Sequence, residues 1–489
     1  MIKQFLNDLE RFYPVLENLI KDGNIKKEWL TDLYEIFNME DNKYITPLKF
    51  NLYNLLIHNP QFLDYDLLSQ KLNLTEDEIY EIFVKGKQAF EVYFPVYDLE
   101  EKESKLYKVL IVEETSKTYT FNRFVDLQHL KSAVNKDFFV IFSNYFTGES
   151  YQLSIVAGLI AKNKSLLQNL AFTGKVSSSG KILPVNHIQE KEKTVQENKK
   201  TLITPDDIST LQELDFWLNS PEMPVILLNR NTDNNLKESL QQIEALIKQD
   251  YPYFNIKNLL KFYNLLEEDL YIITPSVDFS NREDLLNLLK QFEEKLEKLF
   301  SVKNAILYLS LSIASLGFLV GSLIGSRKKA VILHYQGGYY KAIDMSKDPR
   351  VIKQNVSEYK IIQFQDCNND KEDKEVALIL NVASHNPVSS SKSYVEKNLP
   401  QVKSICVIST NYMGNIPLEE FLTLSRELYT YINTIKEKIH LFYSIPVPIS
   451  ISLGMAIAHF KDITLYHYDS KKSEYIKIPV NLNEVISKF

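Results

Sequence analysis

The sequence predicts a multidomain α/β protein with a helical N-terminal domain. The chain has 489 residues, which is too long for one hydrophobic core. Apolar residues recur at helical spacing through the first hundred positions, and short runs rich in Val, Ile and Phe begin near 105. We therefore expect helices over 1–100, an α/β domain over 101–254 and a second, internally repeated α/β domain over 255–489.

The bulk composition excludes several classes of protein. The formal net charge of −7 argues against a partner that is a DNA or RNA polymer. Two cysteines without CxxC spacing and a first segment without a signal-peptide core predict a cytoplasmic protein with reduced thiols. The eight histidines form no metal-binding pattern, so we expect no metal site.

The N-terminal region contains the amphipathic stretches LNDLERFYPVLENLI and DEIYEIFVKGKQAF. One part of it, YDLLSQKLNLTEDEIYEIFVKG, has the rhythm of a helix-turn-helix. Few basic residues lie nearby, which favours a structural or docking role over DNA recognition.

The middle domain opens with two expected strands, LYKVLIVEE and KDFFVIFSN, and continues with GESYQLSIVAGLIA. Ser150 stands where this apolar helix begins, either as a cap or as a nucleophile. In a later expected helix, Ile188, Lys191 and Val195 share one face, which directs Lys191 inward. A buried lysine loses its proton more easily and can act as a general base; the alternative is a lysine whose amine reaches water.

These residues resemble the proteolytic domain of Lon proteases. The likeness rests on GES before the helix, on LAFTGKVSSSGKILPV and on the helix IQEKEK. It implies Ser150 as nucleophile, Lys191 as base and Thr173 close to this dyad. The sequence departs from the family pattern at Tyr151-Gln152 and at Asn186-His187, where small residues are usual. Ser154 is the competing nucleophile. The chain has no GxxxxGK[ST] loop, so we expect no ATP-driven step and no cofactor.

The C-terminal domain repeats itself at a spacing of roughly 130 residues. AILYLSLSIASLGFLVGSLIG corresponds to IHLFYSIPVPISISLGMAIAH, and each is followed by a further strand pair, AVILHYQGGYYKAI or ITLYHYDSKKSEYIKI. The prolines of the second copy break its apolar run into strand, loop and helix. We therefore expect the apolar stretch 304–325 to be a buried strand and helix rather than a membrane span.

Loops that follow the repeated strands carry hydroxyl and amide groups with little charge. Ligands of open α/β sheets bind at such strand ends, and this chemistry suits a nucleotide better than a metal. The alternative is ordinary turn chemistry in each loop. The candidate ligand-binding residues are Thr274, Ser310, Ser384, His385, Lys392, Thr410, Ser444 and Pro446.

The repeated domain resembles the SAVED domain, two fused CARF-like units that sense cyclic oligonucleotides. The resemblance is carried by KIHLFYSIPVPISISLGMAIAHFKDITLYHYD. With the Lon-like segment, the chain resembles the CRISPR-associated Lon proteases of type III antiviral systems. This resemblance implies cyclic oligoadenylate, specifically cyclic tetra-adenylate, as activator. It also implies ligand-dependent head-to-tail assembly and cleavage of a protein encoded nearby.

Two alternatives remain open. The first is a non-catalytic sensor that assembles on nucleotide and docks a partner through an inactive Lon-like domain. Bulky residues beside Ser150 favour this scaffold. The second is a membrane-anchored regulator that uses 304–325 as its anchor.

Overall fold

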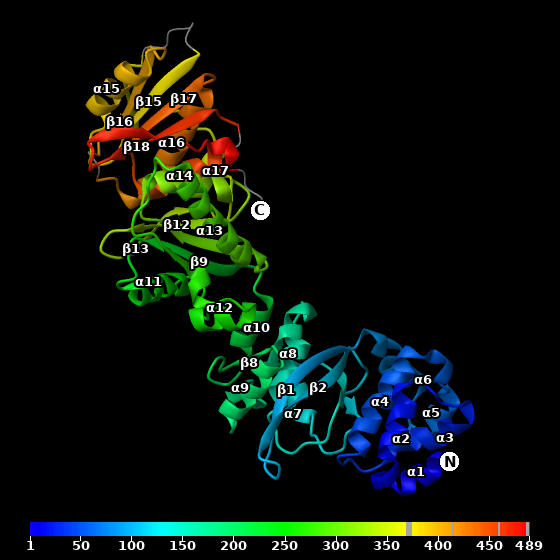
Figure 1. Ribbon diagram of the computed structural model, residues 1–489. Coiled ribbons are helices and arrows are strands. Elements are labelled where there is room, and N and C mark those ends of the chain that lie inside the picture. Colours follow the sequence, from blue (N-terminus) through cyan, green and yellow to red (C-terminus); the bar gives the residue numbers. More distant parts are fainter. Residues whose placement is uncertain (368–373, 413–414, 458–459, 486–488) are drawn as a thin grey trace. The chain divides into compact units, whose positions relative to one another are not determined.

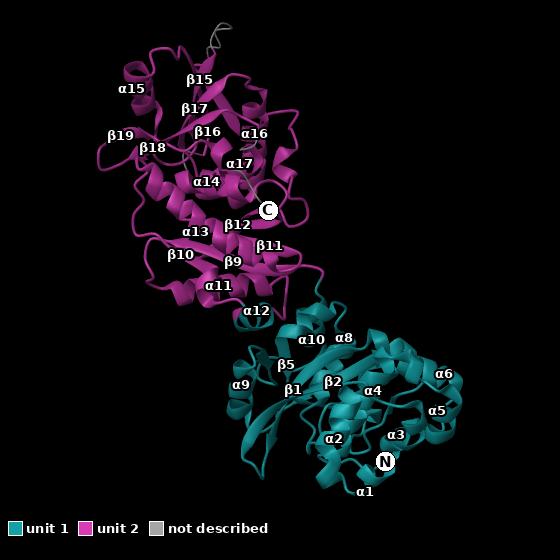
Figure 2. Ribbon diagram, turned by 45° about the vertical axis from the view of Figure 1, so that its right-hand side comes forward, with its two compact units in different colours: residues 1–220, 257–264 teal, residues 221–256, 265–489 magenta. Residues whose placement is uncertain are grey.

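The computed structural model describes residues 1–367, 374–412, 415–457, 460–485 and 489. It divides into two compact units (Figure 2). Unit 1 contains residues 1–220 and 257–264, and unit 2 contains residues 221–256 and 265–489. The chain therefore enters unit 2, returns to unit 1 for one short segment, and enters unit 2 again.

The N-terminal part of unit 1 is helical. It contains α1 (Ile2–Asn7), α2 (Leu9–Lys21), α3 (Leu30–Tyr34), α4 (Ile45–His58), α5 (Tyr65–Leu72) and α6 (Glu76–Ile79). Helix α4 is buried along most of its length, and its apolar side chains share a core with Leu110, Val112, Phe139 and Ile141 of the adjoining sheet. These helices are therefore packed on the sheet rather than separate from it.

The sheet of unit 1 has the order β3-β4-β2-β1-β5-β8. Its strands are β1 (Phe90–Asp98), β2 (Glu103–Glu113), β3 (Tyr119–Thr120), β4 (Phe138–Phe142), β5 (Leu170–Phe172) and β8 (Thr201–Ile203). A separate hairpin pairs β6 (Lys175–Val176) with β7 (Ile182–Leu183). The helices of this part are α7 (Gln128–Val134), α8 (Gln152–Ile160), α9 (Ile188–Glu197), α10 (Leu211–Asn219) and α12 (Ile256–Tyr263).

Strand β1 lies within the residues that the sequence assigned to helices. Its nine residues pair with β2 in antiparallel register, with Pro95 opposite Leu106. A proline lacks the N–H of a ladder hydrogen bond, so it argues against a strand in sequence-based assignment. The α/β part thus begins at Phe90 rather than near 105.

Unit 2 contains two copies of one topology. The first copy consists of β9 (Met223–Arg230), α11 (Leu236–Lys248), β10 (Tyr271–Ile273), α13 (Arg282–Ser301), β11 (Ala305–Ser310), α14 (Ala314–Ile324), β12 (Ala330–Tyr335) and β13 (Tyr339–Asp344). The second consists of β15 (Glu375–Asn381), α15 (Val388–Asn398), β16 (Ser404–Thr410), α16 (Phe421–Thr434), β17 (Lys438–Ser444), α17 (Val447–Ile457), β18 (Ile463–Asp469) and β19 (Glu474–Lys477). An additional edge strand, β14 (Ile362–Gln365), pairs with β16.

The two sheets have corresponding strand orders, β10-β9-β11-β12-β13 and β16-β15-β17-β18-β19. In each, the final strand is antiparallel to a parallel set. Ala305 and Lys438 begin corresponding strands, 133 positions apart, and Ala314 and Val447 begin corresponding helices at the same spacing. The predicted duplication is confirmed, and its first copy starts with β9 at Met223, ahead of residue 255.

Helices α14 and α17 pack against each other between the two sheets (Figure 1). A Cβ atom on Gly321 would lie 2.3 Å from the carbonyl oxygen of Ile451, and one on Gly454 would lie 2.3 Å from that of Phe318. Gly321 and Gly454 are 133 positions apart, as are Phe318 and Ile451. The crossing therefore has local two-fold symmetry and requires glycine on both helices.

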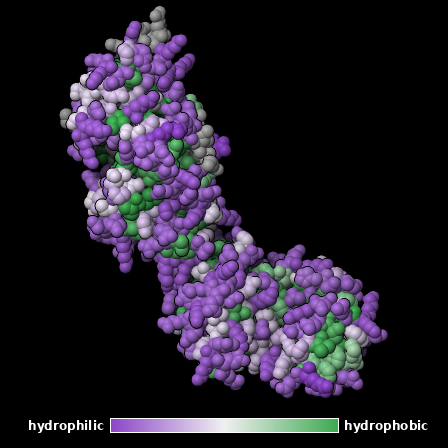
Figure 3. All heavy atoms as spheres, viewed as in Figure 1, coloured by the Kyte–Doolittle hydropathy of each residue, from purple (hydrophilic) through white to green (hydrophobic). Residues whose placement is uncertain are grey.

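The apolar stretch 304–325 is confirmed as a strand, β11, followed by helix α14, whose residues from Ser315 to Ile324 are buried. Among the described residues, no helix has the length and apolar character needed to span a bilayer. The face of the molecule in Figure 3 is mainly hydrophilic, with smaller hydrophobic patches on both units.

The two cysteines differ from expectation. Cys367 and Cys406 form a disulfide, which links the chain after β14 to the neighbouring strand β16. The sequence predicted reduced thiols because the spacing of 39 residues has no motif. Pairing of the edge strand β14 brings the two positions together, and linear spacing does not reveal that pairing.

Candidate functional site

Ser150 does not cap the helix that follows it. Helix α8 begins at Gln152, its N-cap residue is Tyr151, and no side chain caps it. Within the described part of the chain, the Ser150 hydroxyl has no hydrogen-bond partner. Its side chain is partly exposed. The competing Ser154 is fully buried and donates to the carbonyl oxygen of Tyr151 at 2.5 Å.

Lys191 points inward, as the spacing on its helix predicted. The side chain lies on α9 beside the buried Val195, and the residue is only 4% exposed, whereas Lys193 is exposed. Its Nζ donates a hydrogen bond to Thr173 Oγ1 at 3.3 Å. Burial lowers the pKa of the Lys191 amine from 10.5 to about 8.

Main-chain hydrogen bonds bring the Ser150 segment beside Thr173. The N–H of Gly174 donates to the carbonyl oxygen of Ser150 at 3.0 Å, and the N–H of Leu153 donates to that of Gly174 at 3.1 Å. Thr173 directly precedes Gly174 and accepts from Lys191. Thr173 therefore contacts Lys191 through its side chain and adjoins the Ser150 segment through the main chain of Gly174.

The bulky residues next to Ser150 have structural roles. Tyr151 is 3% exposed, and its ring packs against Phe142 and Phe146. Gln152 is fully buried and accepts from the N–H of Val176, at the start of the hairpin. His187, in place of a small residue, has a φ of 61° and stacks on Tyr97. A left-handed backbone explains why a small residue is usual there.

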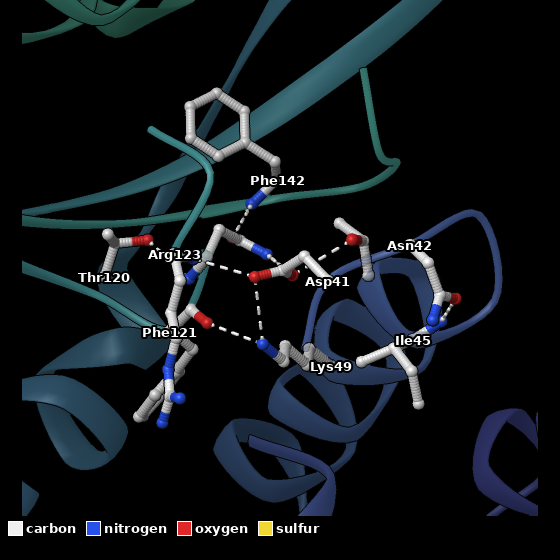
Figure 4. Close-up of polar contacts among 10 residues, drawn as sticks. Asp41, Asn42, Ile45, Lys49, Thr120, Phe121, Arg123 and Phe142 are labelled. Atoms are coloured by element: carbon white, nitrogen blue, oxygen red, sulfur yellow. Dashed lines mark hydrogen bonds and ion pairs between the residues drawn. The ribbon is translucent and has the colours of Figure 1, made fainter. Parts of the chain in front are cut away.

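A buried ion pair anchors the strand that leads to Ser150 (Figure 4). Lys49 lies 3.1 Å from Asp41 and donates to the carbonyl oxygen of Phe121 at 2.8 Å. Asn122 donates to Asp41 at 3.0 Å and accepts from the N–H of Phe142 at 2.9 Å. Phe142 ends β4, so the N-terminal helices and the approach to Ser150 are joined through a charge pair that is shielded from water.

In unit 2, a cavity of about 330 Å³ lies at the carboxyl ends of β9, β11 and β12. The start of α17, from the other repeat, completes it. The lining residues are Asn229, Arg230, Asn231, Thr232, Ser310, Leu311, Ser312, Leu333, His334, Tyr335, Tyr339, Val447 and Pro448.

Asn229 organises the edge of this cavity. Its amide donates to Thr274 Oγ1 at 2.6 Å and to the carbonyl oxygen of Ile272 at 3.1 Å, and its Oδ1 accepts from Ser312 Oγ at 2.9 Å. Around it, Arg230 supplies a cation, and Tyr335, which is 53% exposed, lies beside Tyr339 with ring centroids 5.0 Å apart. A cation, amides and exposed aromatic rings are groups that bind phosphates and bases.

Ser310 lines the cavity, Pro446 immediately precedes its lining residues Val447 and Pro448, and Thr274 is held by Asn229. The other predicted ligand residues belong to the second repeat. Lys392 pairs with Asp366 at 2.7 Å, and the His385 ring contacts that of Tyr468.

The remaining three predicted residues also lie at the strand ends of the second repeat. Ser384 follows β15, Thr410 ends β16, and Ser444 ends β17, where its carbonyl oxygen accepts from the N–H groups of Val382 and Ala383.

Sequence reasoning missed Asn229, Arg230, His334, Tyr335 and Tyr339. Two signals were available. His-Tyr stands at the end of β12, at 334–335, and again directly before the last residue of β18, at 467–468. The buried strand MPVILLNR begins the first repeat, but it precedes the expected domain boundary at 254.

Comparison with known families identifies part of unit 2. Residues 288–478 match the model of SAVED, the "SMODS-associated and fused to various effectors sensor domain". This region is a SAVED domain. Its limits include β11 to β18, so the SAVED region carries both halves of the glycine crossing and much of the cavity lining.

Two solved structures and two curated proteins are also similar to the chain. The SAVED/CARF-domain receptor Cap4 of Acinetobacter baumannii with the cyclic trinucleotide 3′3′3′-cAAA is 16% identical, over 42% of this chain and 44% of that one, with a TM-score of 0.32. Another structure of this receptor is 12% identical, over 83% of this chain and 96% of that one, with a TM-score of 0.31. Neither likeness is close enough to carry an argument beyond the SAVED match.

The chaperone protein HtpG of Helicobacter pylori is 28% identical over 200 residues, which is 37% of this chain and 30% of that protein. HtpG of Helicobacter acinonychis matches to the same extent. The chain thus spans about a third of the length of these curated relatives and less than half of the nucleotide-bound receptor.

Proposed function

We propose that the protein is a serine endopeptidase that cyclic oligoadenylate switches on. Ser150 is the nucleophile, Lys191 the general base, and the unit 2 cavity part of the activator site. The activator is cyclic tetra-adenylate, and the target is a specific protein encoded nearby in a type III CRISPR antiviral system. The reaction requires no ATP, because this sequence contains no GxxxxGK[ST] loop with which to bind it.

One observation carries the catalytic half of this proposal. Lys191 is enclosed, donates to Thr173, and lies beside a segment whose main chain is bonded to that of Ser150. A desolvated amine holds its proton weakly enough to accept another from a serine hydroxyl. A surface lysine would not be buried or bonded to Thr173, and a serine that caps a helix would bond to a backbone N–H of that helix.

The chemistry is acyl transfer in two steps. Ser150 Oγ attacks the scissile carbonyl carbon while its proton passes to Lys191 Nζ. Collapse of the tetrahedral intermediate breaks the C–N bond, and the amine product leaves with that proton. Water then attacks the acyl-serine ester and gives a proton to the neutral Lys191 amine. Collapse of this second tetrahedral intermediate breaks the C–Oγ bond, Lys191 returns the proton to Ser150 Oγ, and the acid product ionises to the carboxylate. Thr173 keeps the amine in position through its hydrogen bond.

The sensing half rests on the SAVED match and on the cavity. Arg230 suits a phosphate, the amide of Asn231 suits a polar edge, and Tyr335 and Tyr339 suit a purine ring. Asn229 serves this site by holding the strand ends in place through its own hydrogen bonds. An activator must bind the active arrangement more tightly than the resting one.

Mass spectrometry of cleavage reactions tests the function. The purified protein is incubated with the proteins encoded beside it, with and without cyclic tetra-adenylate. We expect a fragment only with nucleotide, and none with Ser150→Ala or Lys191→Ala. Ser178→Ala on the hairpin and Lys193→Ala on the same helix are matched controls that should cleave normally. Cleavage by Ser150→Ala would refute the dyad, and nucleotide-dependent assembly without any fragment would favour the scaffold.

The pH dependence gives a second test of Lys191. The neutral amine is the active form, so the cleavage rate should rise about tenfold per pH unit and level off above about 8.

The lowered pKa of Lys191 also lowers the free energy of unfolding at any pH where the amine is protonated in both the folded and the unfolded chain. This penalty is complete below pH 8 and is relieved as the pH rises towards 10.5. Lys191→Met should therefore raise the free energy of unfolding at pH 7, by up to about 3 kcal/mol.

A further inference from the structure

Helix α12 connects two elements of the first repeat but packs in unit 1. It follows α11 and precedes β10, yet residues 257–264 belong to unit 1. Leu259 and Phe262 are buried, and the Phe262 ring stacks on Trp217 of α10 at 5.4 Å. The helix therefore has an apolar contact with unit 1 that holds it there.

Asp207 is the polar centre of this contact, and its carboxylate is fully buried. Lys257 Nζ lies 2.7 Å from Oδ1, and Lys261 Nζ lies 2.8 Å from Oδ2. Asn258 donates to the carbonyl oxygen of Asp207 at 2.7 Å. Three residues on one side of α12 thus bind a single aspartate, which could not remain charged in the interior without such partners.

The same carboxylate holds the end of strand β8. Asp207 Oδ2 accepts from the N–H of Thr204 at 2.9 Å and from its hydroxyl at 3.0 Å. Thr204 directly follows β8, and the carbonyl oxygen of Ile203, the last residue of that strand, accepts from the N–H of Thr173 at 3.0 Å. Thr173 in turn accepts from Lys191.

A continuous set of short contacts therefore runs from α12 to the catalytic amine. We propose that Asp207 is a positioning residue for Thr173 and Lys191, and that α12 fixes Asp207 through Lys257 and Lys261. The inference rests on the proposed function for its catalytic meaning. The placement of Lys191 itself can be measured without any substrate.

If the anchor fails, the end of β8 and Thr173 loosen, and water reaches the Lys191 amine. Its pKa then moves back towards that of a solvated lysine. Competitive labelling with a trace of acetic anhydride across a pH series, read by mass spectrometry of the peptide with Lys191, gives its titration midpoint. Lys193 lies in the same peptide and serves as an internal reference for reagent and recovery.

The variants are Asp207→Asn and the pair Lys257→Met with Lys261→Met. We expect each to raise the Lys191 midpoint by about one pH unit relative to the native chain. Cleavage should show the same upward shift, with kcat lowered at pH 7 and KM little changed. Lys71→Met removes the lysine of an ion pair with Glu35 in the N-terminal helices and should shift nothing. Thermal unfolding verifies that each variant is folded.

Two results would overturn the inference: an unchanged midpoint in a folded Asp207→Asn protein, or in the folded lysine pair variant if Asp207→Asn does not fold. A loss of activity at an unchanged midpoint in a folded variant would also count against it, because Asp207 would then affect cleavage by a route other than the placement of Lys191. If the midpoint shifts but the native chain cleaves nothing, the positioning role stands and the proposed function fails. If cleavage occurs and no midpoint moves, the function stands and the positioning role fails.

Discussion

The two repeats of unit 2 share one topology but differ where their strands end. At the strand ends of the first repeat, Ser310 and Pro448, the latter from the second repeat, line an open cavity. At the strand ends of the second repeat, the corresponding residues are Tyr443, 133 positions after Ser310, and Ser315 of the first repeat, 133 positions before Pro448. There the Tyr443 hydroxyl donates to Ser315 Oγ at 2.7 Å, and Ser315 lies 2.8 Å from His467 Nδ1.

The difference shows how the two copies of a duplicated fold can take different roles. A small side chain at 310 leaves space beside the start of α17, whereas a large one at 443 fills the matching space and bonds to the start of α14. The Phe279 ring adds to this filled side by stacking on His467 at 4.1 Å. We therefore expect the open end to bind ligand and the filled end to hold the two repeats together.

The largest effect should follow from changes at the symmetric crossing of α14 and α17. Gly321→Ala and Gly454→Ala each place a Cβ 2.3 Å from a carbonyl oxygen of the facing helix. The helices must then separate, which should lower the free energy of unfolding by about 3 kcal/mol or more in each variant. Chemical denaturation of the two proteins measures this.

Equal losses from the two glycines would show that the repeats depend on the crossing to the same degree. Gly338→Ala is the control, because its nearest neighbouring atoms lie 3.9 Å away; it should cost less than about 0.5 kcal/mol. If only one of the two glycine variants lost little free energy of unfolding, the helix packing would not be symmetric in solution.

Ser310→Tyr should convert the open end into a filled one. The ring would occupy space beside Val447 and Pro448, so affinity for cyclic tetra-adenylate should fall at least about tenfold, which corresponds to about 1.4 kcal/mol. Isothermal titration calorimetry gives the affinity, and thermal unfolding confirms that the variant is folded. Unchanged affinity would place the ligand outside this cavity.

The smallest effect should come from the filled end. Tyr443→Phe keeps the ring, which packs against Phe318, but removes the hydroxyl that donates to Ser315. The expected loss is about 1 kcal/mol in the free energy of unfolding, with nucleotide affinity unchanged. A large loss of affinity instead would assign ligand binding to the second end as well.

The sequence predicted those features that local spacing controls. The inward direction of Lys191 follows from the period of its helix, and the strand and helix within 304–325 follow from prolines in the second copy. Thr173 came from family resemblance, and the structure brings it to Lys191. These features require only neighbours in the chain or a known motif.

Other features depend on pairing between distant segments. The Cys367–Cys406 disulfide requires β14 to pair with β16. Strand β1 contains Pro95, which argues against a strand when only the sequence is considered. The role of Asn229 appears only when three strand ends meet around it. The packing of α12 in unit 1 is likewise hidden from the sequence, because this helix is inserted between two elements of the first repeat.

The glycine crossing has a consequence for how this sequence can evolve. In a dimer of two identical chains, a residue near the two-fold axis faces its own copy, so any substitution occurs on both sides at once. Here Gly317 faces Ser450, its counterpart 133 positions later, and Ser450 donates to the carbonyl oxygen of Ala314. Joining both copies in one polypeptide makes that unequal pair possible, and with it one-sided substitutions throughout the interface.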